Sequence, residues 1–130
     1  MASLGGDVGA YLALDGHEIW KRPNAYQGAG NTLVFHNKRI YLTHSGGITA
    51  LDADTGAEIW NLNPGQVGHG QESSPIVYKG TLYAGMIGNG FQLVAVGLGT
   101  GSEPPTIRWI KNTFYGYLKA SPAASNGKVY

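Results

Sequence analysis

The sequence predicts an all-β protein, and three observations support this prediction. The 130 residues include 21 glycines, eight tyrosines and three tryptophans, a composition that suits short strands joined by turns. Apolar residues almost never recur at the i, i+3, i+4 and i+7 spacing of an amphipathic helix. Hairpin signals recur along the chain instead. We therefore expect many short antiparallel strands and very little helix.

One type of hairpin is found three times, in segments that superpose without gaps. Each copy has a short apolar strand, a two-residue turn and a second strand that ends in an aliphatic residue and a tyrosine. The copies are LVFHNKRIY (33–41), PIVYKGTLY (75–83) and PAASNGKVY (122–130). Their turn pairs are Asn37-Lys38, Lys79-Gly80 and Asn126-Gly127. Asn-Gly is the strongest short hairpin signal because both residues tolerate positive φ.

A second hairpin type alternates with the first and ends in tryptophan. Its copies are YLALDGHEIW (11–20), ITALDADTGAEIW (48–60) and LVAVGLGTGSEPPTIRW (93–109). Superposed on its Leu-Asp pair, the first copy is about three residues short in its turn, and the third carries about four extra residues, from Ser102 to Pro105. We expect the three tryptophans, Trp20, Trp60 and Trp109, to pack between neighbouring repeats.

The spacing of the two hairpin types predicts the architecture. Tyr41 and Tyr83 are 42 residues apart, and Tyr83 and Tyr130 are 47 apart. A period of about 40 to 50 residues with four strands is the signature of a β-propeller blade. With strands labelled A to D from the axis outward, residues 9–130 form one partial propeller of about three blades. Its segments are 9–22 (C-D), 31–63 (A to D), 73–111 (A to D) and 121–130 (A-B).

Two stretches of this repeat resemble a known family. SGGITALDADTGAEIWNLN and SSPIVYKGTLYAG are similar to the repeat of the pyrroloquinoline-quinone (PQQ)-type β-propellers, whose blades carry Ala-Leu-Asp, Thr-Gly and a closing Trp. The resemblance covers nearly the whole chain after residue 8. It is degenerate in the third copy, where Gly97 and Gly99 replace Asp52 and Asp54. It implies a propeller and an exported or periplasmic protein, and its members include quinone-dependent dehydrogenases and a non-catalytic scaffold lipoprotein of outer-membrane barrel assembly.

Ring closure is the main difficulty for such a chain. Members of the family usually close with six to eight blades, and three blades cannot form a ring. The terminal halves are complementary, because 9–20 supplies only outer strands and 122–130 only inner ones. Two copies related by a two-fold axis would exchange these halves, so the sequence predicts a domain-swapped homodimer with six blades. The alternatives are a fragment of a longer chain and an engineered or recombinant partial propeller that self-assembles.

The two aspartates of ALDADTGAEIW raise the question of a metal site. Counted from Asp52, the glycine of this loop is fifth and the twelfth position is Leu62 or Asn63, whereas an EF-hand loop needs a sixth glycine and a twelfth glutamate. The residues are better explained by turn chemistry, in which Asp accepts backbone hydrogen bonds and Gly supplies the open φ. We assign a structural role in turns to Asp15, Asp52, Asp54, Thr55 and Gly56.

The connections from strand D to the next strand A carry the candidate binding residues. Such connections lie on one face of a propeller, and Gln71 and Glu72 are where the copies differ most. Aromatic residues of these connections could stack on a ligand. The candidate ligand contacts are Tyr26, Gln27, His69, Gln71, Glu72, Phe114, Tyr115, Tyr117 and Lys119. Ordinary loop polarity is the alternative explanation.

Composition argues against several function classes. The net charge is +1 and the nine Lys and Arg are scattered, so we expect no nucleic-acid partner. No stretch has the length of a membrane span, no signal peptide is recognisable, and without cysteine there are no thiolate metal sites. We assign no catalytic residue and no metal. Glu72 is the only acidic candidate on the channel side, so a role for PQQ and calcium belongs to the alternative of a PQQ-dependent dehydrogenase fragment. The expected function is a non-catalytic binding or scaffold module.

Overall fold

A computed structural model describes residues 6–27, 33–70, 73–101, 103–112 and 121–130. Strands make up just over half of the described chain and one four-residue helix is its only helix, with antiparallel pairing throughout, and this confirms the all-β prediction. The elements are β1 (Val8–Tyr11), β2 (Glu18–Arg22), β3 (Val34–His36), β4 (Arg39–His44), β5 (Gly47–Asp52), β6 (Glu58–Leu62), α1 (Pro64–Val67), β7 (His69–Gly70), β8 (Ile76–Tyr78), β9 (Thr81–Gly88), β10 (Gly90–Gly97), β11 (Thr106–Asn112), β12 (Ala124–Ser125) and β13 (Lys128–Val129).

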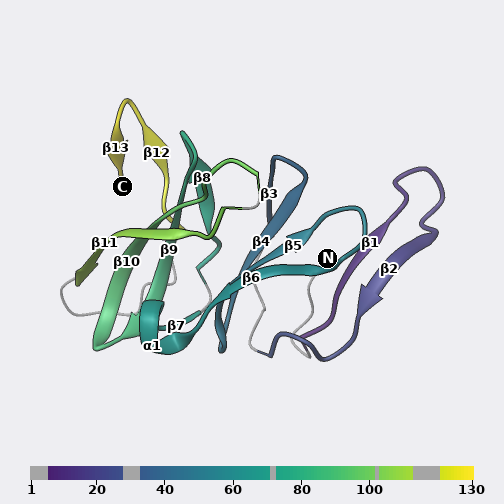
Figure 1. The fold of residues 1–130 in the computed structure, drawn as a ribbon, viewed down its shortest axis with the longest axis horizontal. Helices are drawn as coiled ribbons and strands as arrows, with labels where there is room; N and C mark the ends of the chain where they lie inside the picture. Colours follow the sequence, from purple (N-terminus) through teal and green to yellow (C-terminus); the bar gives the residue numbers. More distant parts are fainter. Residues whose placement is uncertain (1–5, 28–32, 71–72, 102, 113–120) are drawn as a thin grey trace.

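The strands form four sheets that follow one another along the chain. The first is the pair β1-β2, the second has the order β3-β4-β5-β6, and the last is the pair β12-β13. The third contains β11-β10-β9, and both β7 and β8 pair with β9. Figure 1 shows the sheets arrayed side by side, from β1-β2 at the right to β12-β13 at the upper left. Each sheet thus lies beside its sequence neighbours.

The inner hairpins form where the turn pairs predicted them. Asn37 and Lys38, Lys79 and Gly80, and Asn126 and Gly127 all have positive φ, between 48° and 75°. The flanking residues pair across each turn, as in His36 with Arg39 and Ser125 with Lys128. Positive φ at both central residues is the geometry of a type I′ turn, which matches the twist of the strands.

The outer hairpins share one register and one irregularity. The three tryptophans pair with an alanine in each copy: Ala10 with Trp20, Ala50 with Trp60, and Ala95 with Trp109. A β-bulge follows this pair in all three copies. A bulge increases the local twist and redirects the strand at the point where the turn begins.

This register corrects the expected length of the first turn. The amide of Leu12 bonds the carbonyl of His17 at 2.8 Å, as the amide of Asp52 bonds that of Ala57 at 2.8 Å. Residue 12 is therefore equivalent to residue 52, and the turn is not three residues short. The Leu-Asp pair at 14–15 resembles Leu-Asp at 51–52 in sequence, but strand pairing makes it equivalent to residues 54–55 of the second turn. The first two turns have the same length.

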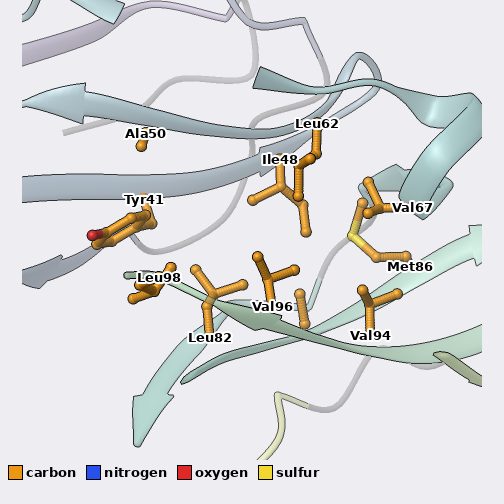
Figure 2. Close-up of a cluster of buried hydrophobic side chains, with 11 residues drawn as sticks. Tyr41, Ile48, Ala50, Leu62, Val67, Leu82, Met86, Val94, Val96 and Leu98 are labelled. Carbon is orange, nitrogen blue, oxygen red and sulfur yellow. The ribbon is translucent and has the colours of Figure 1, made fainter. Parts of the chain in front are cut away.

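Two apolar clusters join the first three sheets. The larger lies between the second and third sheets, where Tyr41, Ile48 and Ala50 face Leu82, Val94 and Val96 (Figure 2). Leu42 and Leu51 belong to the other cluster, with Val8 and Tyr26. Because side chains alternate along a strand, β4 and β5 bury one set of residues against each neighbouring sheet.

Candidate functional site

The aspartate turn after β5 is a closed structural unit. One oxygen of Asp52 accepts hydrogen bonds from the amide of Asp54 at 3.1 Å and from the amide and hydroxyl of Thr55, both at 2.8 Å. The Thr55 hydroxyl and these amides hold the pKa of Asp52 below its ordinary value. This carboxylate is occupied by its own turn, and the described residues contain no group of three His, Cys, Asp or Glu that could hold a metal.

The other two outer turns obtain a carboxylate from different positions. In the first turn, the carboxylate of Asp15 accepts from the amide of His17 at 2.9 Å. At the equivalent place in the second turn, the hydroxyl of Thr55 accepts from the amide of Ala57. In the third turn Glu103 accepts from the amide of Thr100 at 3.0 Å. By strand pairing, Thr100 is equivalent to Thr55 and Gly97 to Asp52. Glu103, which lies in the four-residue insertion, therefore supplies the carboxylate that Asp52 supplies in the second turn. Sequence reasoning missed this role of Glu103, although the insertion directly follows the turn that lost its aspartate.

Trp20 joins the first sheet to the turn of the second. Its indole N–H donates to the carbonyl of Ala53 at 3.0 Å, and a Cβ added to Gly56 would lie 2.5 Å from the ring. Arg22 donates to the carbonyl of Gly56 at 2.8 Å. Only glycine at residue 56 leaves room for the indole, so the turn is a docking surface as well as a corner.

The other two tryptophans have different surroundings. Trp60 and Trp109 each lie 5.8 Å, centroid to centroid, from the tyrosine of their own sheet, Tyr41 and Tyr83 respectively. The Trp60 indole nitrogen is buried without a hydrogen-bond partner in the part of the chain that the structure describes. The turn that Trp60 would meet is the one lengthened by 102–105.

A hollow of about 590 Å³ opens where the connection between the second and third sheets meets the far ends of β9, β10 and β11. In Figure 1 this is the lower side, where α1 and β7 lie, opposite the inner hairpin turns. The lining comprises Pro64, Gly65, Gln66, Gly68, His69, Ile87, Gly88, Asn89, Gln92, Ile110 and Asn112. None of these described lining residues is Asp, Glu, Lys or Arg, so the described part of the lining is polar without a carboxylate, ammonium or guanidinium group.

Hydrogen bonds fix how the polar side chains face this hollow. Nδ1 of His69 lies 2.6 Å from the carbonyl of Ser45, which can only accept. Nδ1 is therefore the donor in this bond, and in the tautomer that carries its one proton on Nδ1 the other nitrogen, Nε2, is left as an acceptor. Gln66 accepts from the amide of Asn63 at 3.1 Å through its oxygen, which leaves its N–H donors. Gln92 donates to the carbonyl of Val67 at 2.9 Å, which leaves its oxygen.

Ser45 brings two connections together on this side of the molecule. The amide and hydroxyl of Ser45 donate to the carbonyl of Gln27 at 3.0 Å and 2.7 Å. The carbonyl of Ser45 accepts from His69. The predicted candidates Gln27 and His69, from successive connections, are thus both anchored to the turn between β4 and β5, and both are exposed.

Tyr26 is placed differently from the expectation of a ligand contact. It is only 3% exposed, and its hydroxyl donates to Glu58 at 3.0 Å. Burial and this hydrogen bond raise the pKa of Tyr26 to about 12. Its ring meets the edge of His44 at 4.9 Å between centroids. The side chain belongs to the core between the first two sheets and is not accessible to a ligand.

Six candidates lie outside the described residues: Gln71, Glu72, Phe114, Tyr115, Tyr117 and Lys119. In sequence, the first two follow β7 and the others follow β11. Four amides that line the hollow were not predicted from the sequence, namely Gln66, Asn89, Gln92 and Asn112. For Asn89, the sequence did contain a signal, because the Gly-Asn-Gly triplet at 88–90 is typical of a turn.

The described residues of the hollow do not form a PQQ-calcium site. Calcium takes six to eight oxygen ligands, with carboxylates prominent among them. The described lining offers neutral amides and one imidazole, and no carboxylate.

No helix among the described residues is both long and apolar enough to cross a membrane.

Side-by-side antiparallel sheets with tryptophan-ended outer hairpins define the chain as part of a β-propeller. The crystal structure of BamB from Moraxella catarrhalis has the same fold, with a TM-score of 0.73 and 19% sequence identity over 97% of this chain. The chain belongs to the PQQ-repeat family described as outer membrane protein assembly factor BamB, whose model matches residues 2–130. This confirms the PQQ-type resemblance. The chain spans 37% of the length of the Moraxella protein. None of the curated proteins matches.

Proposed function

We propose that the chain is a non-catalytic β-propeller module that binds a protein partner through the hollow beside α1. The observation that supports this is the set of uncharged donors and acceptors around it. The imidazole Nε2 of His69 and the oxygen of Gln92 are left to accept, and the amide N–H groups of Gln66 are left to donate. A peptide group offers one donor and one acceptor of its own.

An extended polypeptide suits this lining better than an ionic ligand. Phosphates and carboxylates bind most strongly to cationic side chains, and no described lining residue is Lys or Arg. Ile87 and Ile110 supply apolar contact between the polar groups. A segment with small or apolar side chains would use both features.

The family name suggests the kind of partner. The matching family is described by a role in outer membrane protein assembly. We propose that the partner is a protein of outer-membrane assembly or one of its unfolded substrates, and that the chain works in an exported, periplasmic location. No cofactor is required for this function. Reproducible dye-linked alcohol oxidation on addition of PQQ and calcium would favour the dehydrogenase alternative instead.

The same proposal includes the arrangement of blades. Segments 9–22, 31–63, 73–111 and 121–130 are proposed as the C-D, A to D, A to D and A-B parts of three blades. Two chains would then complete a six-bladed ring as a homodimer. The order of sheets supports the proposal, because β1-β2 stands at one end of the array and β12-β13 at the other (Figure 1).

Substitution at His69 tests the binding site. His69→Asn keeps a donor for the carbonyl of Ser45 and removes the Nε2 acceptor. His36→Asn is the matched control, because His36 is the last residue of β3, beside the turn between β3 and β4, and is not among the residues that line the hollow. The probe is a fluorescent, urea-unfolded outer-membrane β-barrel protein diluted into buffer, with binding measured by anisotropy.

We expect saturable binding that His69→Asn weakens about fivefold, since one hydrogen bond contributes roughly 1 kcal/mol. His36→Asn should bind like the wild type. Absence of binding by the wild type, or equal binding by both variants, would contradict the proposed site.

A further inference from the structure

We propose that His44 is a pH-sensitive positioning residue for the hollow: its neutral ring holds the turn between β4 and β5, which anchors His69, and protonation of that ring releases the turn. The inference rests on the proposed function, since it concerns the regulation of the same hollow. It is carried by a continuous series of hydrogen bonds that runs from a buried ring to the lining.

The ring of His44 is buried and is bonded at both nitrogens. The amide of Gly46 can only donate, so Nδ1 of His44, at 3.0 Å, is the acceptor. A neutral ring that accepts at Nδ1 carries its proton on Nε2, which donates to the hydroxyl of Thr49 at 2.8 Å. That hydroxyl also accepts from the side-chain amide of Asn61 at 2.6 Å. Only the neutral ring satisfies both Gly46 and Thr49.

The turn that His44 holds is also the anchor of His69. Ser45 lies between His44 and Gly46 in the chain, and its carbonyl accepts from Nδ1 of His69 at 2.6 Å. The strand β7, which carries His69, packs directly on this part of the chain, because a Cβ added to Gly70 would overlap the amide nitrogen of His44. A displacement of Ser45 therefore removes the bond that orients the His69 ring at the hollow.

Glycines let the turn fit closely between the ring and the end of β6. A Cβ added to Gly46 would lie 2.7 Å from Cε1 of His44, and one added to Gly47 would overlap the carbonyl of Leu62. Gly47 has φ of 110°, a value that other residues rarely adopt. Because the turn contacts the imidazole on one side and β6 on the other, a change at the ring displaces the turn.

Protonation of His44 turns its bond to Gly46 into a repulsive contact. Both nitrogens of an imidazolium are donors, so the new N–H at Nδ1 faces the N–H of Gly46. The repulsion is relieved when Gly46 moves away from the ring, and Ser45 directly precedes Gly46 in the chain. The carbonyl of Ser45 then leaves Nδ1 of His69, and the His69 ring loses its fixed orientation.

The groups around His44 determine where its ring titrates. The titratable side chains on the described elements packed around it are Tyr26, which lies 4.9 Å away between ring centroids, Glu58 of β6 and His69 of β7. Arg22 of β2 lies 5.6 Å from the centre of the Tyr26 ring. Burial lowers the pKa of His44 from 6.5 and the carboxylate of Glu58 opposes this, with burial the larger effect. The ring is therefore mainly neutral at neutral pH and gains its proton in acid.

NMR of the full 130-residue chain tests the coupling without any ligand. The amide of Gly46 and the ring nitrogens of His69 are followed from pH 8 to pH 5 in the wild type and two variants. His44→Asn keeps an amide oxygen near the position of Nδ1 and cannot titrate. His36→Asn is the matched control, because His36 is not among the residues that line the hollow. Circular dichroism checks that each variant is folded.

In the wild type and in His36→Asn, we expect Gly46 and His69 to change with the midpoint of the His44 ring, below its ordinary 6.5. In His44→Asn this transition should be absent, and any remaining change at His69 is the titration of its own ring.

Anisotropy with the same unfolded β-barrel probe, over the same pH range, tests the consequence for binding. All three proteins should bind alike at pH 8. At pH 5 the wild type and His36→Asn should bind about fivefold more weakly than His44→Asn, because loss of the His69 contact removes about one hydrogen bond. Titration of His69 and of the probe itself affects all three proteins, so the difference between them isolates His44.

A Gly46 amide or a His69 ring that does not follow His44 in the wild type would overturn the proposal, whatever the variants do. Equal weakening of all three proteins in acid would overturn it as well. Absence of binding at every pH would overturn the proposed function, and the NMR titration would still decide whether His44 positions His69.

Discussion

At the scale of single residues, equivalent tryptophans differ in what their indole N–H groups meet. Trp20 donates to the carbonyl of Ala53, whereas the Trp60 nitrogen is buried without a partner among the described residues. An unsatisfied buried donor is unfavourable, while a satisfied one contributes about 1 kcal/mol. We expect Trp20→Phe to lower the free energy of unfolding by about 1 kcal/mol more than Trp60→Phe does. Urea unfolding followed by circular dichroism measures both, and equal losses would contradict the difference.

His44 should make stability depend on pH. Its Nδ1 accepts from the amide of Gly46 at 3.0 Å and its Nε2 lies 2.8 Å from the hydroxyl of Thr49, so the neutral ring is already bonded on both sides. Burial lowers the pKa of His44 from its ordinary 6.5. On acidification the unfolded chain therefore takes up this proton before the folded chain does. The free energy of unfolding should fall as pH drops from about 6.5 toward the folded pKa.

The His44 contribution is separated from that of other groups by comparing variants. His44→Gln removes the titrating ring, and His17→Gln is the control because His17 is exposed. Urea unfolding at pH 8 and pH 5.5 should show a larger loss on acidification for the wild type and His17→Gln than for His44→Gln. If all three proteins lose the same amount, burial of His44 does not contribute to the pH dependence.

At the scale of elements, the third outer turn differs from the other two by its four-residue insertion. The insertion contributes Glu103 as the acceptor for the amide of Thr100. It also makes the turn of the third sheet, which follows the sheet of Trp60, four residues longer than the turn that Trp20 contacts. Deletion of 102–105 combined with Gly97→Asp gives a turn with the length and aspartate of the second. We expect the shortened turn to place a carbonyl near the Trp60 N–H and to raise the free energy of unfolding by up to about 1 kcal/mol. A clear loss of stability by urea unfolding would show that the insertion is required.

The elements also show which local features can be predicted from the sequence. The inner hairpins were predictable because positive φ at a turn pair is a property of two adjacent residues, such as Asn126 and Gly127. The predicted length of the first outer turn was wrong because its Leu-Asp pair, residues 14–15, lies in a different register from the Leu-Asp pair at 51–52. Register is set by pairing with the opposite strand, here Ala10 with Trp20, so similarity within the turn does not determine it.

At the scale of the whole molecule, the all-β repeat could be predicted and the hollow could not. The repeat follows from a periodic pattern of turns and closing tryptophans. The hollow combines Gln66 of α1, Asn89 of the turn between β9 and β10, and Asn112 at the end of β11, which meet only after the third sheet has formed. Amides in loops are common, and nothing in their spacing indicates that these three lie together.

The proposed ring makes the stability of the chain depend on its concentration. Two of six blades would be shared between chains, so unfolding and dissociation would be linked, and each tenfold rise in concentration adds about 1.4 kcal/mol per dimer. We expect the melting temperature, measured by circular dichroism, to rise between 1 and 100 µM chain. A wild-type melting temperature that does not change over this range would mean that β1-β2 and β12-β13 are stable without a partner chain, and that the sheets seen here fold as an open arc.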